Sequence, residues 1–112
     1  MMCLQLIQDA LNSVKGVHVS HYHALKRNPP YIVWSEDGSG AQLSGDNRMV
    51  AQAIQGTVDL YTKKEDDPLI NQIQAVLNTD KIALSLNASG YEEETKLIHY
   101  QWIFEVSNME VV

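Results

Sequence analysis

Apolar residues recur at helical spacing in the first fifteen positions of the chain. Leu4, Ile7, Leu11 and Val14 are three or four positions apart, so they form a single stripe along a helix of residues 3–15. Gly16 follows this stripe, and glycine readily adopts the left-handed conformation that ends helices. The pattern predicts a helix with one buried face.

A second helix is predicted after Asp67 and Pro68. Aspartate is a favoured N-cap residue, and proline is well suited to the first helical position. The helix is expected to end near Asn78. Its apolar positions lie on one face: Leu69, Ile70, Ile73, Val76 and Leu77.

Two short segments before the middle of the chain favour β-strands by composition. Residues 17–25 and 31–34 are rich in β-branched and aromatic side chains. Residues 26–30 between them end in two prolines, which cannot donate backbone hydrogen bonds to a sheet. The sequence therefore predicts a turn or an extended linker that joins the two strands into a hairpin or meander.

Three further segments alternate between apolar and polar residues, as half-buried strands do: 49–62, 82–87 and 96–106. The alternation is imperfect at residues 51–53, which suggests a β-bulge. The second of these strands is expected to stop within residues 87–90. The large aromatic residues are expected in the core, because they bury the most surface: Trp34, Tyr100, Trp102 and Phe104.

Residues 36–47 contain many glycine, serine, aspartate and asparagine residues and almost nothing to bury. They are predicted to form an exposed, mobile loop, and long loops of this kind are often functional. The predicted partner surface consists of two sets. The loop contributes Asp37, Gly38, Ser39, Gly40, Gly45, Asp46 and Asn47. The polar face of the following strand contributes Gln55, Thr57, Asp59 and Tyr61, and the last strand could extend it with His99, Gln101 and Glu105.

Together these elements predict an α+β fold in the order αβββαββ. Its sheet of four to five strands should be mostly antiparallel, with both helices packed on one face. The length of 112 residues predicts a single domain that spans residues 1–112.

Composition narrows the possible partners. Fourteen acidic residues against eight basic ones give a net charge of −6, and the basic residues are scattered. Nucleic-acid binding needs clustered lysine and arginine, so no specific nucleic-acid partner is expected. The single cysteine suits a reducing compartment. The chain shows neither a signal-peptide pattern nor an apolar run of membrane-spanning length, so a cytoplasmic location without a membrane is expected.

Histidine side chains are common zinc ligands, so the four histidines are candidates for a metal site. If residues 17–23 form a strand, His21 and His23 share a face while His18 points away, so a third ligand would have to be His99. Surface or partly buried imidazoles are the favoured interpretation. Cys3 has only apolar neighbours and no Gly-x-Ser-x-Gly motif occurs, so neither a catalytic residue nor a cofactor is predicted.

Several segments resemble the tail-terminator or tail-completion proteins, also called minor tail or head-tail joining proteins, of long-tailed phages and prophages of Gram-positive bacteria. They are Pro30-Tyr31-Ile32-Val33, Gly45-Asp46-Asn47, the run from Val58 to Lys64 leading into Asp67-Pro68, and the closing strand from Tyr100 to Glu105. The resemblance spans about residues 29–106. It departs at Met49–Ala53, where members of the family usually carry tyrosine or lysine.

The resemblance implies a non-enzymatic, homo-oligomeric structural protein, commonly a ring of six subunits, at the head-proximal end of the tail. Its partners would be the tail-tube protein and the head connector proteins, and its location the bacterial cytoplasm during assembly and then the virion tail. Two alternatives stay open. One is a head-completion adaptor or minor capsid protein, and the other is a small ligand- or metal-binding domain that uses the histidines.

Overall fold

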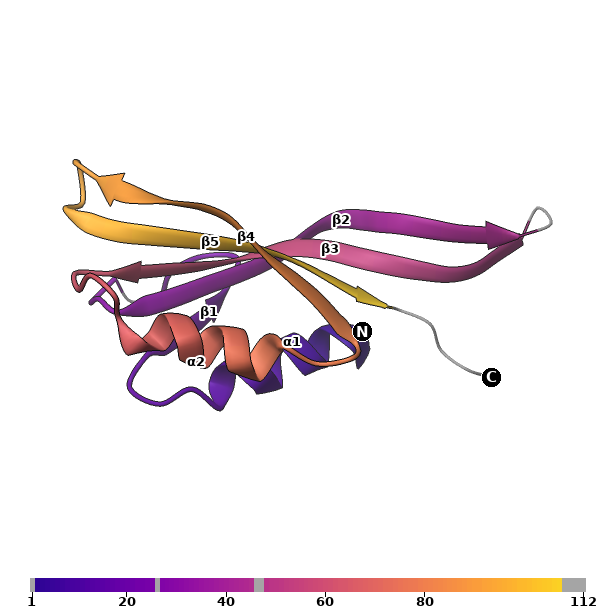
Figure 1. Ribbon diagram of the computed structural model, residues 1–112, viewed down its shortest axis with the longest axis horizontal. Helices are drawn as coiled ribbons and strands as arrows, with labels where there is room; N and C mark the ends of the chain where they lie inside the picture. Colours follow the sequence, from indigo (N-terminus) through magenta and orange to yellow (C-terminus); the bar gives the residue numbers. More distant parts are fainter. Residues whose placement is uncertain (1, 26, 46–47, 108–112) are drawn as a thin grey trace.

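The computed structural model describes residues 2–25, 27–45 and 48–107. Along the chain these residues form α1 (Met2–Asn12), β1 (His18–His21), β2 (Tyr31–Gly45), β3 (Arg48–Thr62), α2 (Pro68–Leu77), β4 (Ile82–Glu92) and β5 (Leu97–Ser107). The strands form one sheet in the order β1-β2-β3-β5-β4, and both helices lie on the same side of it (Figure 1). The α+β fold, its element order and its mostly antiparallel sheet are confirmed.

The first helix carries its apolar stripe into the core as predicted. Leu4, Ile7, Leu11 and Val14 are all buried against the sheet and α2. The helix ends at Asn12, somewhat earlier than expected, and the chain turns through Gly16 at a φ of 77°. Glycine meets no steric penalty in this left-handed region.

The second helix begins where the sequence predicted. The Asp67 carboxylate accepts a hydrogen bond from the backbone N–H of Leu69 at 2.9 Å, as an N-cap does. Its second oxygen accepts a hydrogen bond from the Thr62 hydroxyl at 2.6 Å. Both side chains are buried, so this contact ties the end of β3 to the start of α2.

Two tryptophans connect the sheet to the helices. Trp34 of β2 donates its indole N–H to Gln8 of α1 at 3.0 Å, and Trp102 of β5 donates its own to Gln74 of α2 at 3.1 Å. Both indoles are buried in the core, which confirms their predicted position. Buried Trp N–H groups need such acceptors. Phe104 is also buried, whereas Tyr100 is half-buried at the margin of the core.

The pairing of the first two strands was predicted wrongly. Residues 18–21 of β1 run parallel to residues 31–34 of β2, so the two strands form neither a hairpin nor a meander. The connection 22–30 returns the chain to the starting end of β1 before β2 begins. Composition favours a strand but says nothing of the direction of its partner.

The predicted loop 36–47 is also wrong in its main part, because residues 36–45 continue β2 and pair with β3. Apolar and polar residues do not alternate in this glycine- and serine-rich segment, but backbone pairing with β3 does not require alternation. The register shifts at three places, one of them opposite Ala53, which agrees with the irregularity expected at 51–53. The predicted end of the strand that begins at Ile82 is also wrong. β4 does not stop at 87–90 but reaches Glu92 after a register shift between Leu86 and Ala88.

The outer part of the β2–β3 hairpin has no third strand among the described residues. β1 accompanies β2 only as far as Trp34, and β5 accompanies β3 only from Ala53 to Thr62. The rest of the hairpin, residues 40–45 with 48–52, is a two-stranded ribbon that extends past the ends of both helices (Figure 1). It contributes to the elongated shape of 50 × 25 × 23 Å.

Candidate functional site

The sheet face opposite the helices carries one of the two sets that make up the predicted partner surface. Gln55, Thr57, Asp59 and Tyr61 alternate along β3 on this uncovered face, and each is half-buried. Asp37 is exposed on β2, Gly38 and Ser39 follow it where β3 still pairs with β5, and the two-stranded ribbon contains Gly40 and Gly45. Asp46 and Asn47 lie outside the described residues. The predicted set is therefore spread over the uncovered face and β2.

A network of hydrogen bonds and an ion pair joins three strands on the uncovered face. The Asp59 carboxylate of β3 is 2.7 Å from Nε2 of His99 and accepts a hydrogen bond from the side-chain amide of Gln101 at 2.9 Å. The other ring nitrogen of His99, Nδ1, is 3.4 Å from a carboxylate oxygen of Glu92 in β4. Each nitrogen of His99 thus faces a carboxylate, an arrangement that suits the doubly protonated imidazolium.

Three aromatic rings stack across the same face. Tyr61 lies flat on His99 with ring centres 4.4 Å apart, and Tyr31 stacks on the other side of Tyr61 at 4.9 Å. Burial, together with the nearby charge of Asp59, raises the pKa of Tyr61 to about 12. Its hydroxyl therefore stays protonated at neutral pH and can donate a hydrogen bond to a partner, but it cannot act there as a base.

The pKa of His99 is raised above its ordinary value of 6.5. The hydrogen bond to Asp59 is the main cause, burial opposes it, and the charges of Asp59 and Glu92 add to the rise. A group whose pKa is higher in the folded state contributes stability that is fully present below its unfolded pKa. That contribution is lost as the pH rises through the folded pKa. The network therefore stabilises the fold most below about pH 6.5.

The variant Asp59→Asn should lower the pKa of His99 and weaken the pH dependence just described. The substitution removes the negative charge that favours the imidazolium, while the amide oxygen can still accept a hydrogen bond. An NMR titration of the His99 Cε1 proton measures the pKa directly. Urea unfolding at pH 5.5 and 8.5 should show that the wild type loses more stability at the higher pH than the variant does.

Glu105→Gln is the matched control, because Glu105 lies on the same face of β5 but opposite Gln55, six positions along the strand from His99. It removes one negative charge without touching the network. If Asp59→Asn and Glu105→Gln shift the His99 titration equally, the specific contact with Asp59 is refuted.

A groove of about 430 Å³ opens between the uncovered face and the connection from β1 to β2. Tyr31, Tyr61 and Asp59 contribute from the sheet, Glu92 from the end of β4, and Arg27 from the connection. Tyr31 is itself buried, and burial raises the pKa of its hydroxyl despite the nearby Arg27. The groove therefore combines aromatic rings, protonated hydroxyls and charges of both signs, which suits recognition of a polar protein surface.

A second polar cluster lies at the β1 edge, and sequence reasoning missed it. Glu36 accepts a hydrogen bond from the Tyr22 hydroxyl and lies 2.7 Å from Nε2 of His21. The His21 ring is sandwiched between Tyr22 and Trp34, with ring centres 4.0 Å away on both sides. Burial alone would raise the pKa of Glu36, but the hydrogen bonds from Tyr22 and His21 lower it. The sequence did not indicate this cluster because the composition around Glu36 favours a loop.

The four histidines lie at four different places. His21 belongs to the edge cluster, His99 to the network on the uncovered face, and His23 lines the groove. His18 lies 3.2 Å from the Ser20 hydroxyl on β1. Within residues 2–25, 27–45 and 48–107, no three histidine, cysteine, aspartate or glutamate side chains come together as ligands for a metal ion.

Neither α1 nor α2, the two helices in the described part of the chain, is long and apolar enough to cross a membrane. Comparison of the sequence with models of known protein families gave no match, and comparison with curated proteins gave none either.

Proposed function

We propose that this protein is a structural component of a phage or prophage tail, of the tail-terminator or tail-completion type. It would assemble as a ring, commonly of six copies, at the head-proximal end of the tail, stop tube growth and join the tail to the head. The resemblance of residues 29–106 to that group motivates the proposal. The two-stranded ribbon of β2 and β3 is the structural observation that carries it.

The ribbon favours an assembly role on physical grounds. A two-stranded hairpin is marginally stable in water when no third strand or helix packs on it. Residues 40–45 and 48–52 form such a hairpin, and they extend well past the helices. Contact with a neighbouring subunit or tail protein would supply the missing packing. The uncovered face, which includes half-buried Asp59 and Tyr61, offers a second contact.

Deletion of the gene from an inducible phage tests the role. We expect tails of uncontrolled length, or finished tails that fail to join heads, when lysates are viewed by electron microscopy. The full-length chain supplied from a plasmid should restore infectious particles. Normal virions from the deletion strain would refute the proposal.

A shortened hairpin tests whether the ribbon carries the role. Gln42 pairs with Gln52, so an Asn-Gly turn can replace residues 43–51 between them and leave Ala53, the first β3 residue that pairs with β5, in place. The variant should keep the circular dichroism spectrum of a folded α+β protein but fail to complement the deletion. Full complementation by this variant would show that the ribbon is dispensable. Sedimentation of both proteins over a range of concentrations would show whether the ribbon also drives self-assembly.

A further inference from the structure

The edge strand β4 lacks most of the features that protect exposed strands from pairing. Such strands are usually short, or they carry lysine, proline or inward-pointing charges. β4 is eleven residues long, and it has no charged residue and no proline from Ile82 to Tyr91. Most of its side chains are exposed, and β5 pairs with only one of its sides. Its one irregularity is the register shift between Leu86 and Ala88.

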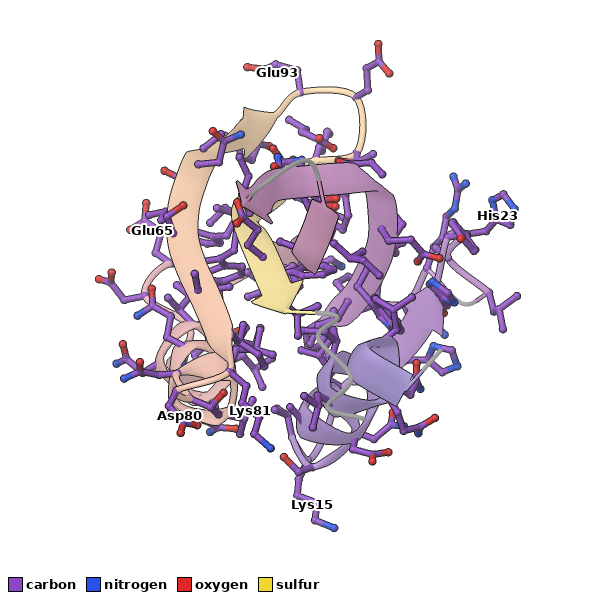
Figure 2. The ribbon with its side chains drawn as sticks, turned by 90° about the vertical axis from the view of Figure 1, so that its right-hand side faces the viewer. Lys15, His23, Glu65, Asp80, Lys81 and Glu93 are labelled. Atoms are coloured by element: carbon purple, nitrogen blue, oxygen red, sulfur yellow. The ribbon has the colours of Figure 1, made fainter. Side chains whose placement is uncertain are left out.

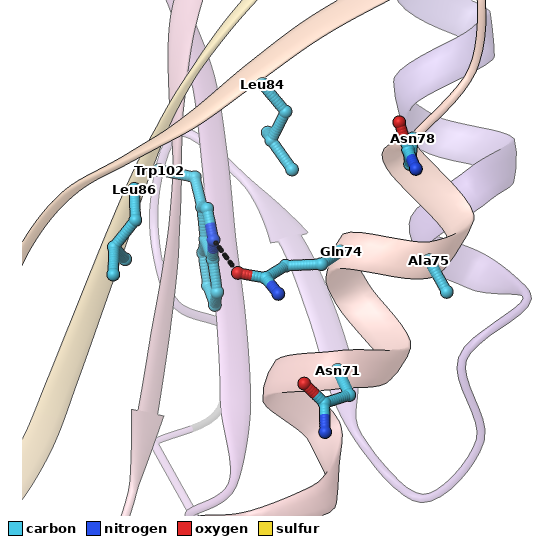
Figure 3. A pocket seen from close by; sticks show the side chains of 7 residues that line it. All are labelled: Asn71, Gln74, Ala75, Asn78, Leu84, Leu86 and Trp102. Atoms are coloured by element: carbon cyan, nitrogen blue, oxygen red, sulfur yellow. Dashed lines mark hydrogen bonds between the residues drawn. The ribbon is translucent and has the colours of Figure 1, made fainter.

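A groove of about 340 Å³ runs beside this edge, between β4 and α2. Leu84 and Leu86 of β4 form its apolar wall, and the Trp102 indole lies at its floor (Figure 3). Leu86 is 53% exposed, although it is a large apolar side chain. The facing wall on α2 carries side-chain amides, from Asn71, Gln74 and Asn78. Gln74 is already held by the indole N–H of Trp102.

We propose that β4 binds an extended segment of another protein as an additional strand, and that an aliphatic side chain of this segment fills the groove. A free edge supplies backbone donors and acceptors in a row, which gives affinity for any extended chain. Specificity comes from the pocket, because only alternate side chains of the added strand point toward the helices. A small aliphatic group fits walls made of leucine, tryptophan and neutral amides.

Charge favours another protein over a second copy of this chain. In an antiparallel pair of two copies, Asp80 and Lys81 of one copy, whose charges cancel, would face Glu92 of the other, so a second copy gains little attraction at this end. α2 has no charged residue from Pro68 to Leu77, whereas Glu92 ends β4 and is followed by Glu93 and Glu94. Glu93 points away from the body at the C-terminal end of β4, and Asp80 and Lys81 lie at its N-terminal end (Figure 2). An antiparallel segment would thus place its N-terminal residues near the glutamates, where lysine or arginine fits best.

A synthetic peptide of the sequence Lys-Lys-Thr-Leu-Thr-Leu-Thr-Leu-Thr-Gly tests the inference with the purified full chain. It has basic residues at its N-terminal end and aliphatic residues at alternate positions. We expect the backbone amide NMR signals of residues 82–92 to shift on titration, together with the indole signal of Trp102. A peptide with Glu-Glu in place of Lys-Lys should bind at least tenfold more weakly.

Leu86→Lys should weaken binding of the lysine peptide at least tenfold, because it places a charge in the apolar groove. Leu25→Lys is the matched control: Leu25 is 78% exposed in the connection between β1 and β2, outside this groove. Circular dichroism confirms that both variants are folded. No binding to the wild type, or equal binding by the two variants, would overturn the proposal. So would a wild-type dimer that Leu86→Lys dissociates, because a second copy would then be the occupant. None of these outcomes depends on the role in phage tails.

Discussion

Replacing Gly56 by alanine should destabilise the protein by about 3 kcal/mol or more, at the upper end of the cost of overpacking. Gly56 lies in the middle of β3, between β2 and β5. A Cβ atom there would overlap the backbone carbonyl oxygen of Ser35, and it would lie 2.6 Å from the Phe104 ring and 2.7 Å from the Cα of Glu36. The backbone atoms of β2 cannot retreat without breaking hydrogen bonds of the sheet.

Thermal unfolding followed by circular dichroism measures this effect, and the midpoint should fall by more than about 10 °C. Gly90→Ala is the matched control. Gly90 is also a strand glycine, in β4, but a Cβ atom at this position meets nothing within 4 Å. We expect it to change the midpoint by no more than a few degrees. Comparable midpoints for the two variants would contradict the close packing of β2 against Gly56.

Trp102→Ala should cost about 3–5 kcal/mol of unfolding free energy, the usual range for removal of a large buried aromatic side chain. Only 1% of Trp102 is exposed, and its indole is both part of the core and the hydrogen-bond donor to Gln74. Its loss would leave a cavity between β5 and α2. Urea unfolding at constant pH measures the cost.

Trp102→Phe separates the two contributions of this residue. Phenylalanine keeps most of the buried ring surface but cannot donate to Gln74, so it should cost clearly less than alanine. A cost below about 1 kcal/mol for Trp102→Ala would mean that the site collapses without a cavity, contrary to the packing seen here.

The helices and the alternating strand segments were predictable because their signals are local. The stripe that contains Ile7 and Leu11 needs only the helical period, and the cap at Asp67 needs only its own neighbours along the chain. The extent of β2 was not predictable in this way. Gly38 and Ser39 pair with the part of β3 that β5 also holds, and the pairing with β3 then continues to Gly45, past the point where the side chains favour it.

The candidate site was only partly predictable for the same reason. Alternation placed Asp59 and Tyr61 on one face, but the partner of Asp59 is forty positions away at His99. Their contact depends on the register between β3 and β5, which no local pattern encodes. Glu92 reaches His99 only because β4 continues beyond Gly90, and Glu36 meets His21 only because β1 and β2 are parallel.

The strand order also bears on how the chain folds. β2 with β3, and β4 with β5, are each adjacent in sequence, so both pairings join segments that are close along the chain. The sheet is complete only when β3 meets β5 at its centre, a pairing that must close over α2 and β4. The hydrogen bond from Thr62 to Asp67 favours this pairing, because it fixes the direction in which the chain leaves β3. Among the antiparallel pairs of this sheet, the pairing of β3 with β5 therefore has the largest entropic cost of loop closure.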